Sequence, residues 1–223
     1  MNALLRWARD IATVAIVLAL FLLARAFVVE AFRIPTGSME GTLLVGDFLL
    51  VNKLLYGADL AGGVRVPALA HPKRGEVVVF VPPHEPGRSY VKRIVGVAGD
   101  TLSMRDKVLH RNGVPQVEPY ALHLDPNGDP LDPDMLWQAP YVVDGSEVQR
   151  PSRDNWGPII VPPDSYFVLG DNRDDSHDSR FWGFVPASAV RGRPLMVYFS
   201  VDRDVREAGF GAVRWGRIGE AIR

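Results

Sequence analysis

The stretch Tyr90-Val91-Lys92-Arg93-Ile94-Val95-Gly96-Val97 sets the fold class of this 223-residue chain. Its β-branched and aromatic residues favour a strand, and Gly99-Asp100 ends the run with a turn signal. The preceding run, Glu76-Val77-Val78-Val79-Phe80-Val81, has the same character and is closed by Pro82-Pro83. Both runs therefore predict short strands bounded by turns.

Three further apolar runs share this length and punctuation: Asp47–Lys53, Tyr166–Leu169 and Leu195–Phe199. The chain also holds 18 prolines and 21 glycines, which favour turns over long helices. We therefore predict a mainly β protein. Its antiparallel-sheet core would comprise residues 31–102 and 165–201.

The middle of the chain has a different composition. Residues 103–164 contain few long apolar runs and carry Asp125-Pro126-Asn127-Gly128-Asp129-Pro130. We expect a smaller inserted β-rich subdomain here, although a long surface excursion is an open alternative. The C-terminal tail, 202–223, is either a short amphipathic segment or poorly ordered.

Composition excludes several classes of function. The formal net charge is −1, so no overall field attracts nucleic acid, and the absence of cysteine excludes disulfides and thiol catalysis. A calcium loop beginning at Asp171 fails because Trp182 stands where the last acidic ligand is needed. We predict no metal and no cofactor.

The N-terminal segment, residues 1–30, carries a membrane-length apolar run. Ile11–Val29 holds one charge, Arg25, and as a helix would span about 28 Å, close to the hydrocarbon thickness of a bilayer. We predict a transmembrane anchor over about 11–29; a cleaved signal peptide ending near Ala24-Arg25-Ala26 is the alternative. The positive charges of Arg6 and Arg9 favour a cytoplasmic N-terminus, which would place the rest of the chain on the outer side of the membrane.

A candidate nucleophile follows this run, in Pro35-Thr36-Gly37-Ser38-Met39. Gly37 permits close backbone approach, and Pro35 biases Ile34 toward an extended conformation. The hydroxyl of Thr36 could complete an oxyanion hole with the backbone N–H of Ser38. An ordinary loop after a membrane helix is the alternative.

The candidate base is Lys92, which sits inside an apolar strand. Apolar surroundings disfavour the charged form of lysine, so its pKa falls and the neutral amine can accept the proton of a serine. A strand lysine that extends to water is the alternative reading.

The densest polar segment of the chain is Gly170–Gly183. It reads either as a solvated acidic turn or as a scaffold in which Asp178 pairs with Arg180 and Ser176 orients a base. We expect His177 to be a surface residue.

Together these segments resemble the bacterial type I signal peptidases. That family has a serine box close to P-S-G-S-M-x-P-T-L, a lysine box close to K-R-V-x-G-x-P-G-D and a late G-D-N-x-x-x-S-x-D-S-R box. The matching stretches here are Pro35–Leu43, Lys92–Asp100 and Gly170–Arg180. Gly41 and Ala98 depart from the pattern, since each replaces a proline.

The resemblance implies a membrane-anchored serine endopeptidase with Ser38 as nucleophile, Lys92 as base and Thr36 with Ser38 at the oxyanion. It implies that Ser176 orients Lys92, and that Asp178 and Arg180 brace the site. Residues implied to line pockets for small −1 and −3 side chains of a signal peptide are Phe32, Ile34, Met39, Leu43, Tyr90 and Val91.

The implied partners are the signal peptides of exported preproteins and membrane lipid. We expect a monomer in the cell membrane, spanning it once, with its catalytic domain on the extracytoplasmic side. Two alternatives remain open: a self-cleaving Ser-Lys regulator, and a non-catalytic membrane-tethered β scaffold that binds peptides.

Overall fold

The computed structural model describes residues 2–27, 29–57, 67–126, 129, 131–143, 151–202 and 212–223, without the side chains of 2–5, 8 and 20–29. Residue 28 of the predicted anchor lies outside the described residues. The same holds for 127–128, 130 and 144–150 of the predicted insert and for 203–211 of the predicted tail.

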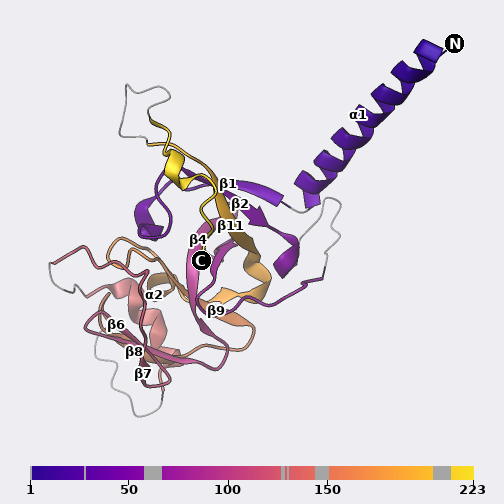
Figure 1. Ribbon diagram of the computed structural model, residues 1–223. Helices are drawn as coiled ribbons and strands as arrows, with labels where there is room; N and C mark the ends of the chain where they lie inside the picture. Colours follow the sequence, from indigo (N-terminus) through magenta and orange to yellow (C-terminus); the bar gives the residue numbers. More distant parts are fainter. Residues whose placement is uncertain are drawn as a thin grey trace.

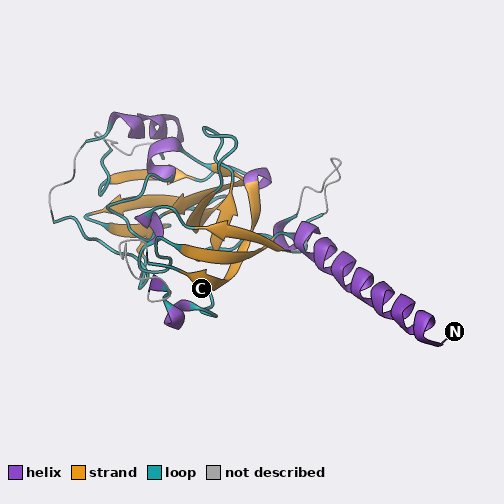
Figure 2. Ribbon diagram, turned by 90° about the horizontal axis from the view of Figure 1, so that it is seen from above, coloured by secondary structure: helices purple, strands orange, loops and turns teal. Residues whose placement is uncertain are grey.

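The core is a seven-stranded sheet in which every pairing is antiparallel (Figure 2). In spatial order its strands are β1 (Val29–Arg33), β2 (Asp47–Asn52), β11 (Val190–Ser200), β3 (Val77–Phe80), β4 (Tyr90–Val97), β9 (Ser165–Leu169) and β10 (Val185–Pro186). The mainly β prediction is confirmed, and each of the five predicted apolar runs lies on one of these strands.

A second, four-stranded sheet occupies part of the middle of the chain. Its strands are, in spatial order, β7 (Val114–Pro115), β6 (Val108–Arg111), β5 (Thr101–Arg105) and β8 (Trp156–Ile160). The 3-10 helix η3 (Pro133–Tyr141) packs against the short helix α2 (Ser179–Trp182) of the late polar segment. Figure 1 shows β6, β7 and β8 at the end of the molecule away from β1 and β2. The division of the chain into a core, an insert and a tail stays a prediction.

Elsewhere in the described part of the chain, the structure gives bounds for the short 3-10 helices η1 (Gly37–Met39), η2 (Leu54–Tyr56), η4 (Ala187–Ala189) and η6 (Trp215–Arg217). Of these, η1 positions the candidate nucleophile. Its Met39 is only 1% exposed and packs with Ile34, Leu49 and Val79, so burial of one side chain fixes this turn on the sheet.

The N-terminal helix, α1 (Asn2–Phe27), projects from the β body (Figures 1 and 2). Its apolar side chains Trp7, Ile11 and Val14 are each at least 65% exposed. Within the part of the chain that the structure describes, no helix has both the length and the hydropathy needed to cross a membrane.

Candidate active site

Ser38 is presented by η1, directly after β1 has ended. Thr36 at the N-cap is extended, with φ −131° and ψ 158°, and the backbone N–H of Glu40 closes the turn on the carbonyl of Gly37. Because Met39 is anchored in the core, its neighbour Ser38 remains partly exposed at the surface of a cavity.

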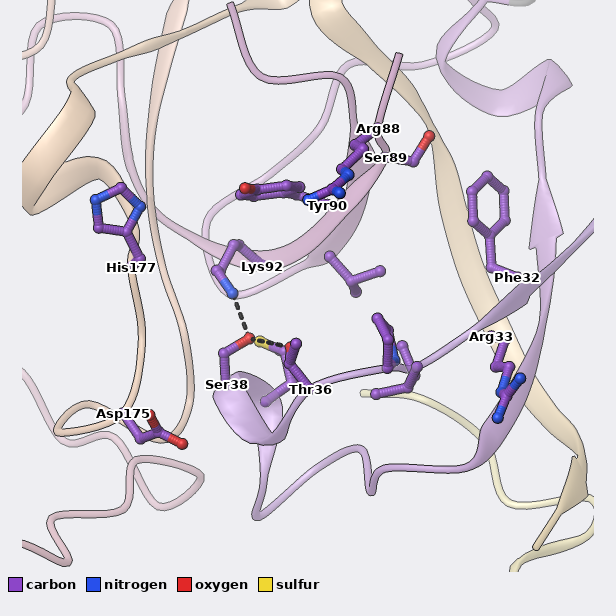
Figure 3. Close-up of a pocket in the computed structure, with 14 residues that line it drawn as sticks. Phe32, Arg33, Thr36, Ser38, Arg88, Ser89, Tyr90, Lys92, Asp175 and His177 are labelled. Atoms are coloured by element: carbon purple, nitrogen blue, oxygen red, sulfur yellow. Dashed lines mark hydrogen bonds between the residues drawn. The ribbon is translucent and has the colours of Figure 1, made fainter. Parts of the chain in front are cut away.

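Lys92 reaches Ser38 from the facing strand β4. Its side chain is only 4% exposed, and its Nζ is hydrogen-bonded to the Oγ of Ser38 (Figure 3). The fold thus brings together the two residues that the sequence analysis paired from segments 54 residues apart.

The surroundings of Lys92 favour its neutral form. Burial lowers the pKa of Lys92 from 10.5 to about 8, although the nearby carboxylate of Asp178 pulls in the opposite direction. The Arg180 guanidinium contributes to the lowering, since a second positive charge is unfavourable there. At neutral pH a useful fraction of this amine is therefore free to accept a proton.

A cavity of about 690 Å³ opens beside this pair. Five of the six residues predicted to form substrate pockets line it: Phe32, Ile34, Met39, Tyr90 and Val91. The sixth does not. Leu43 is fully buried in the core, because the chain turns after Met39 and the N–H of Leu43 bonds the Met39 carbonyl.

Two strand edges face this cavity. β9 pairs with β4 only from Arg93 onward, so among the described residues Tyr90–Lys92 has no strand neighbour on that side. β1 is the outermost strand of its sheet, and Phe32–Thr36 lines the other wall. Unpaired backbone donors and acceptors of this kind can bind an extended peptide by strand addition.

Thr36 lies near the reactive hydroxyl. Its Oγ1 is 3.5 Å from the Oγ of Ser38 (Figure 3). The first N–H groups of a helical turn have no acceptor within that turn, so the backbone N–H of Ser38, in η1, is suited to bind an oxyanion.

The late polar segment forms a scaffold around the pair. Asp178 is fully buried and accepts two hydrogen bonds of 2.8 Å from the Arg180 guanidinium. Burial alone would raise the pKa of Asp178, but Arg180 and the N–H of Gly170 hold it below its ordinary value. Arg180 also donates to the carbonyls of Arg173 and Ser176, so this ion pair fixes the path of the loop.

Ser176 is placed beside Ser38 by a glycine. A Cβ added to Gly170 would overlap both the Oγ of Ser176 and the carbonyl oxygen of Ser38. The Ser176 hydroxyl is buried and makes no hydrogen bond to Lys92 among the described residues, but it lies close enough to the Asp178 carboxylate to help lower the pKa of that group. His177 is exposed, as expected for a surface residue, yet it lines the cavity.

The sequence analysis missed two hydrogen bonds by which Asn172 holds the nucleophile segment, which we call the Asn172 clasp. The backbone N–H of Asn172 donates to the Ser38 carbonyl at 3.2 Å, and its side-chain amide donates to the Gly37 carbonyl at 3.4 Å. An asparagine in a polar loop carries no signal of such a role, because the two segments are distant in sequence.

A second missed feature is the buried ion pair of Arg93 and Asp171. Arg93 is 2% exposed, donates to both carboxylate oxygens of Asp171 at 2.8 and 2.6 Å, and stacks over the Tyr120 ring at 3.8 Å. Thr42 also donates to Asp171, at 2.6 Å, which ties the serine segment to the lysine strand. An arginine inside an apolar strand was the available signal, since a buried guanidinium needs a partner.

The departure at Gly41 also has a structural explanation. Its φ is +101°, a value that proline cannot adopt. The turn after the nucleophile is therefore built for glycine in this chain.

A serine hydroxyl held against a buried lysine amine, beside a groove with free strand edges, has the geometry of a serine peptidase. A family model described as "Signal peptidase, peptidase S26" matches residues 4–199, and the chain belongs to this family. It is 38% identical to signal peptidase I of Pseudomonas aeruginosa, over 82% of this chain and 69% of that one. It is 31% identical to signal peptidase I of Aquifex aeolicus, over 86% of this chain and 84% of that one.

These matches confirm the predicted family and the prediction that the protein is an enzyme, a peptidase. They favour the signal peptidase over both alternatives, the self-cleaving regulator and the non-catalytic scaffold.

Proposed function

We propose that this peptidase removes signal peptides from exported preproteins, with Ser38 as nucleophile and Lys92 as general base. The observation that carries this proposal is the hydrogen bond between Ser38 Oγ and the buried amine of Lys92, whose pKa burial lowers to about 8. No other described serine has a lysine amine as a hydrogen-bond partner.

In the first step, neutral Lys92 takes the proton of Ser38 as Oγ attacks the carbonyl carbon of the scissile bond. The tetrahedral intermediate carries its negative charge on the former carbonyl oxygen. The Ser38 N–H and the Thr36 hydroxyl, 3.5 Å from the nucleophile, stabilise that oxyanion. The intermediate then collapses, and the Lys92 ammonium protonates the departing amine of the mature chain.

The second step reverses these roles with water. Lys92 removes a proton from water, the hydroxide attacks the acyl ester, and the ammonium returns the proton to Ser38 Oγ. Ser176 is the residue we assign to orient Lys92 during these steps, because its buried hydroxyl lies beside the Ser38 backbone and close to Asp178, the carboxylate whose charge also acts on Lys92.

The substrate lies extended between the edges of Phe32–Thr36 and Ser89–Lys92. Backbone hydrogen bonds to these edges supply affinity whatever the sequence of the signal peptide. Ile34, Met39 and Val91 form the apolar walls that select small residues at −1 and −3.

The membrane anchor belongs to the proposal as well. The exposed apolar side chains of α1, such as Val14 and Val17 at 67% and 60%, support insertion of this helix into lipid. The catalytic body would then lie on the extracytoplasmic side. Wild type should stay in the membrane pellet after alkaline carbonate extraction, and a double variant, Val14→Arg with Val17→Arg, should be released; release of wild type would contradict an anchor.

The test of the catalytic pair is processing of a preprotein ending in Ala-x-Ala by the full chain in detergent. Ser38→Ala and Lys92→Ala should each lower kcat by about 10⁴-fold or more, and the double variant should lose no more than either single variant. Lys73→Ala is the matched control, because Lys73 is exposed and lies outside the cavity. Cleavage that persists in Lys92→Ala would show that Lys92 is not the general base.

A further inference from the structure

The cavity has two chemically different halves on either side of the catalytic pair (Figure 3). Phe32 and Arg33 lie on one side of Ser38 and Lys92, and Asp175 and His177 lie on the other. If the half that holds Phe32 receives the −1 and −3 side chains on its apolar walls, as the proposed function holds, the chain after the scissile bond must leave past Asp175 and His177.

Asp175 differs from its acidic neighbours in the same loop. Asp171 is bound by Arg93, Asp174 by Lys107 and Asp178 by Arg180, with N–O distances between 2.6 and 3.1 Å. The Asp175 side chain is exposed and has no ion-pair or hydrogen-bond partner among the described residues. It is also the one carboxylate among the described residues that line the cavity.

Asp175 acts on the reaction centre through space. Its charge is among those that raise the pKa of Lys92, against the larger lowering effect of burial, so the carboxylate lies within electrostatic range of the reacting amine. A cationic side chain beside the scissile bond would therefore meet an unpaired negative charge.

The His177 ring is held in place by packing next to the Asp175 carboxylate. Its ring stacks on Phe181 of α2, with centroids 5.2 Å apart and an interplanar angle of 21°. The His84 ring lies 6.2 Å away and packs on Trp182 at 5.2 Å. Rings anchored to a helix in this way offer an apolar surface for the stem of a long side chain, with Asp175 available for its charged end.

We infer that Asp175 and His177 form the site for the first two residues of the mature chain, and that Asp175 favours a basic over an acidic side chain there. This inference rests on the proposed function. It adds a recognition element for the part of the preprotein that survives cleavage.

The test uses two peptide substrates that differ only at the second residue after the cleavage site, with lysine in one and glutamate in the other. Wild type should cleave the lysine peptide with about fivefold higher kcat/KM, the scale of one exposed ion pair gained and one repulsion avoided. The ratio should approach one in Asp175→Asn and invert in Asp175→Lys. Because it compares two substrates of one enzyme, any change in the pKa of Lys92 cancels.

Asp134→Asn is the matched control, because Asp134 is an exposed aspartate outside the cavity, and it should keep the wild-type ratio. Raising the salt to about 1 M should shrink the wild-type ratio by screening the pair. A ratio unchanged in Asp175→Asn and Asp175→Lys would overturn this inference and leave the proposed function standing. Failure of wild type to cleave either peptide would overturn both.

Discussion

The pH dependence of cleavage should follow the neutral fraction of Lys92. With a pKa of about 8, roughly 9% of this amine is neutral at pH 7, about half at pH 8 and about 90% at pH 9. We therefore expect kcat/KM to rise about tenfold from pH 7 to pH 9 and then to level off. An ordinary lysine would be only about 0.03% neutral at pH 7, so burial enriches the active form of the base about 300-fold.

The assay is initial-rate cleavage of a peptide without titratable groups near the scissile bond, by the full chain in detergent between pH 6 and pH 10. The break in the profile of kcat/KM reports the pKa of the free enzyme. Asp175→Asn should move the break to lower pH, because that carboxylate raises the pKa of Lys92. Asp134→Asn should leave it in place.

Two results would refute this reasoning. A flat profile from pH 6 to pH 10 means that no group with a pKa near 8 must lose its proton. A rise that continues up to pH 10 without a break means that the amine behaves as a solvated lysine. Tryptophan fluorescence at each pH checks that the protein stays folded across the range.

Three further predictions concern the groups around the pair. Thr36→Val should lower kcat about a hundredfold with little change in KM, while Thr36→Ser, which keeps the hydroxyl, should retain activity; equal losses would argue against an oxyanion role. Gly170→Ala should abolish most activity because its methyl group overlaps Ser176, whereas Gly216→Ala, with nothing within 4 Å of the added atom, should match wild type in the same cleavage assay. Lys92→Met should raise the free energy of unfolding by about 3 kcal/mol at pH 7, since the pKa falls from 10.5 to about 8 at about 1.4 kcal/mol per unit. Between pH values equal to those two pKa values, only the unfolded state of wild type holds the lysine proton, so the free energy of unfolding of wild type should rise with pH. In denaturant titrations, the stability advantage of Lys92→Met over wild type should therefore be gone above pH 10.5. A stability difference that stays constant with pH would contradict the assigned pKa.

The strands of the main sheet could be predicted because their patterns are local. Val77–Phe80 and Tyr90–Val97 are apolar, β-branched and bounded by turn residues, which is sufficient to propose a strand. The second sheet could not be placed strand by strand. Val108–Arg111 and Val114–Pro115 are short and mixed in polarity, and their sheet is completed by Trp156, whose packing on Phe167 joins distant segments.

In the candidate site, too, local features could be predicted and long-range contacts could not. Ser38 and Lys92 could be proposed from their local surroundings, a turn after a strand and an apolar strand interior. The contacts that hold them could not, because Asn172 reaches the Ser38 backbone only in the folded chain. The burial of Leu43 was likewise missed, since it depends on how tightly the chain turns after Met39.

The clasp of Asn172 on the Ser38 carbonyl bears on when this protein first becomes able to cut. Contacts between segments far apart in sequence form late in folding, because closing long loops is entropically unfavourable. In a partly folded molecule, the Ser38 hydroxyl and the Lys92 amine would therefore be apart, and the molecule would not cleave the unfolded chains around it. Such a peptidase should become active only when its fold is complete, so that the onset of preprotein cleavage reports that folding has finished.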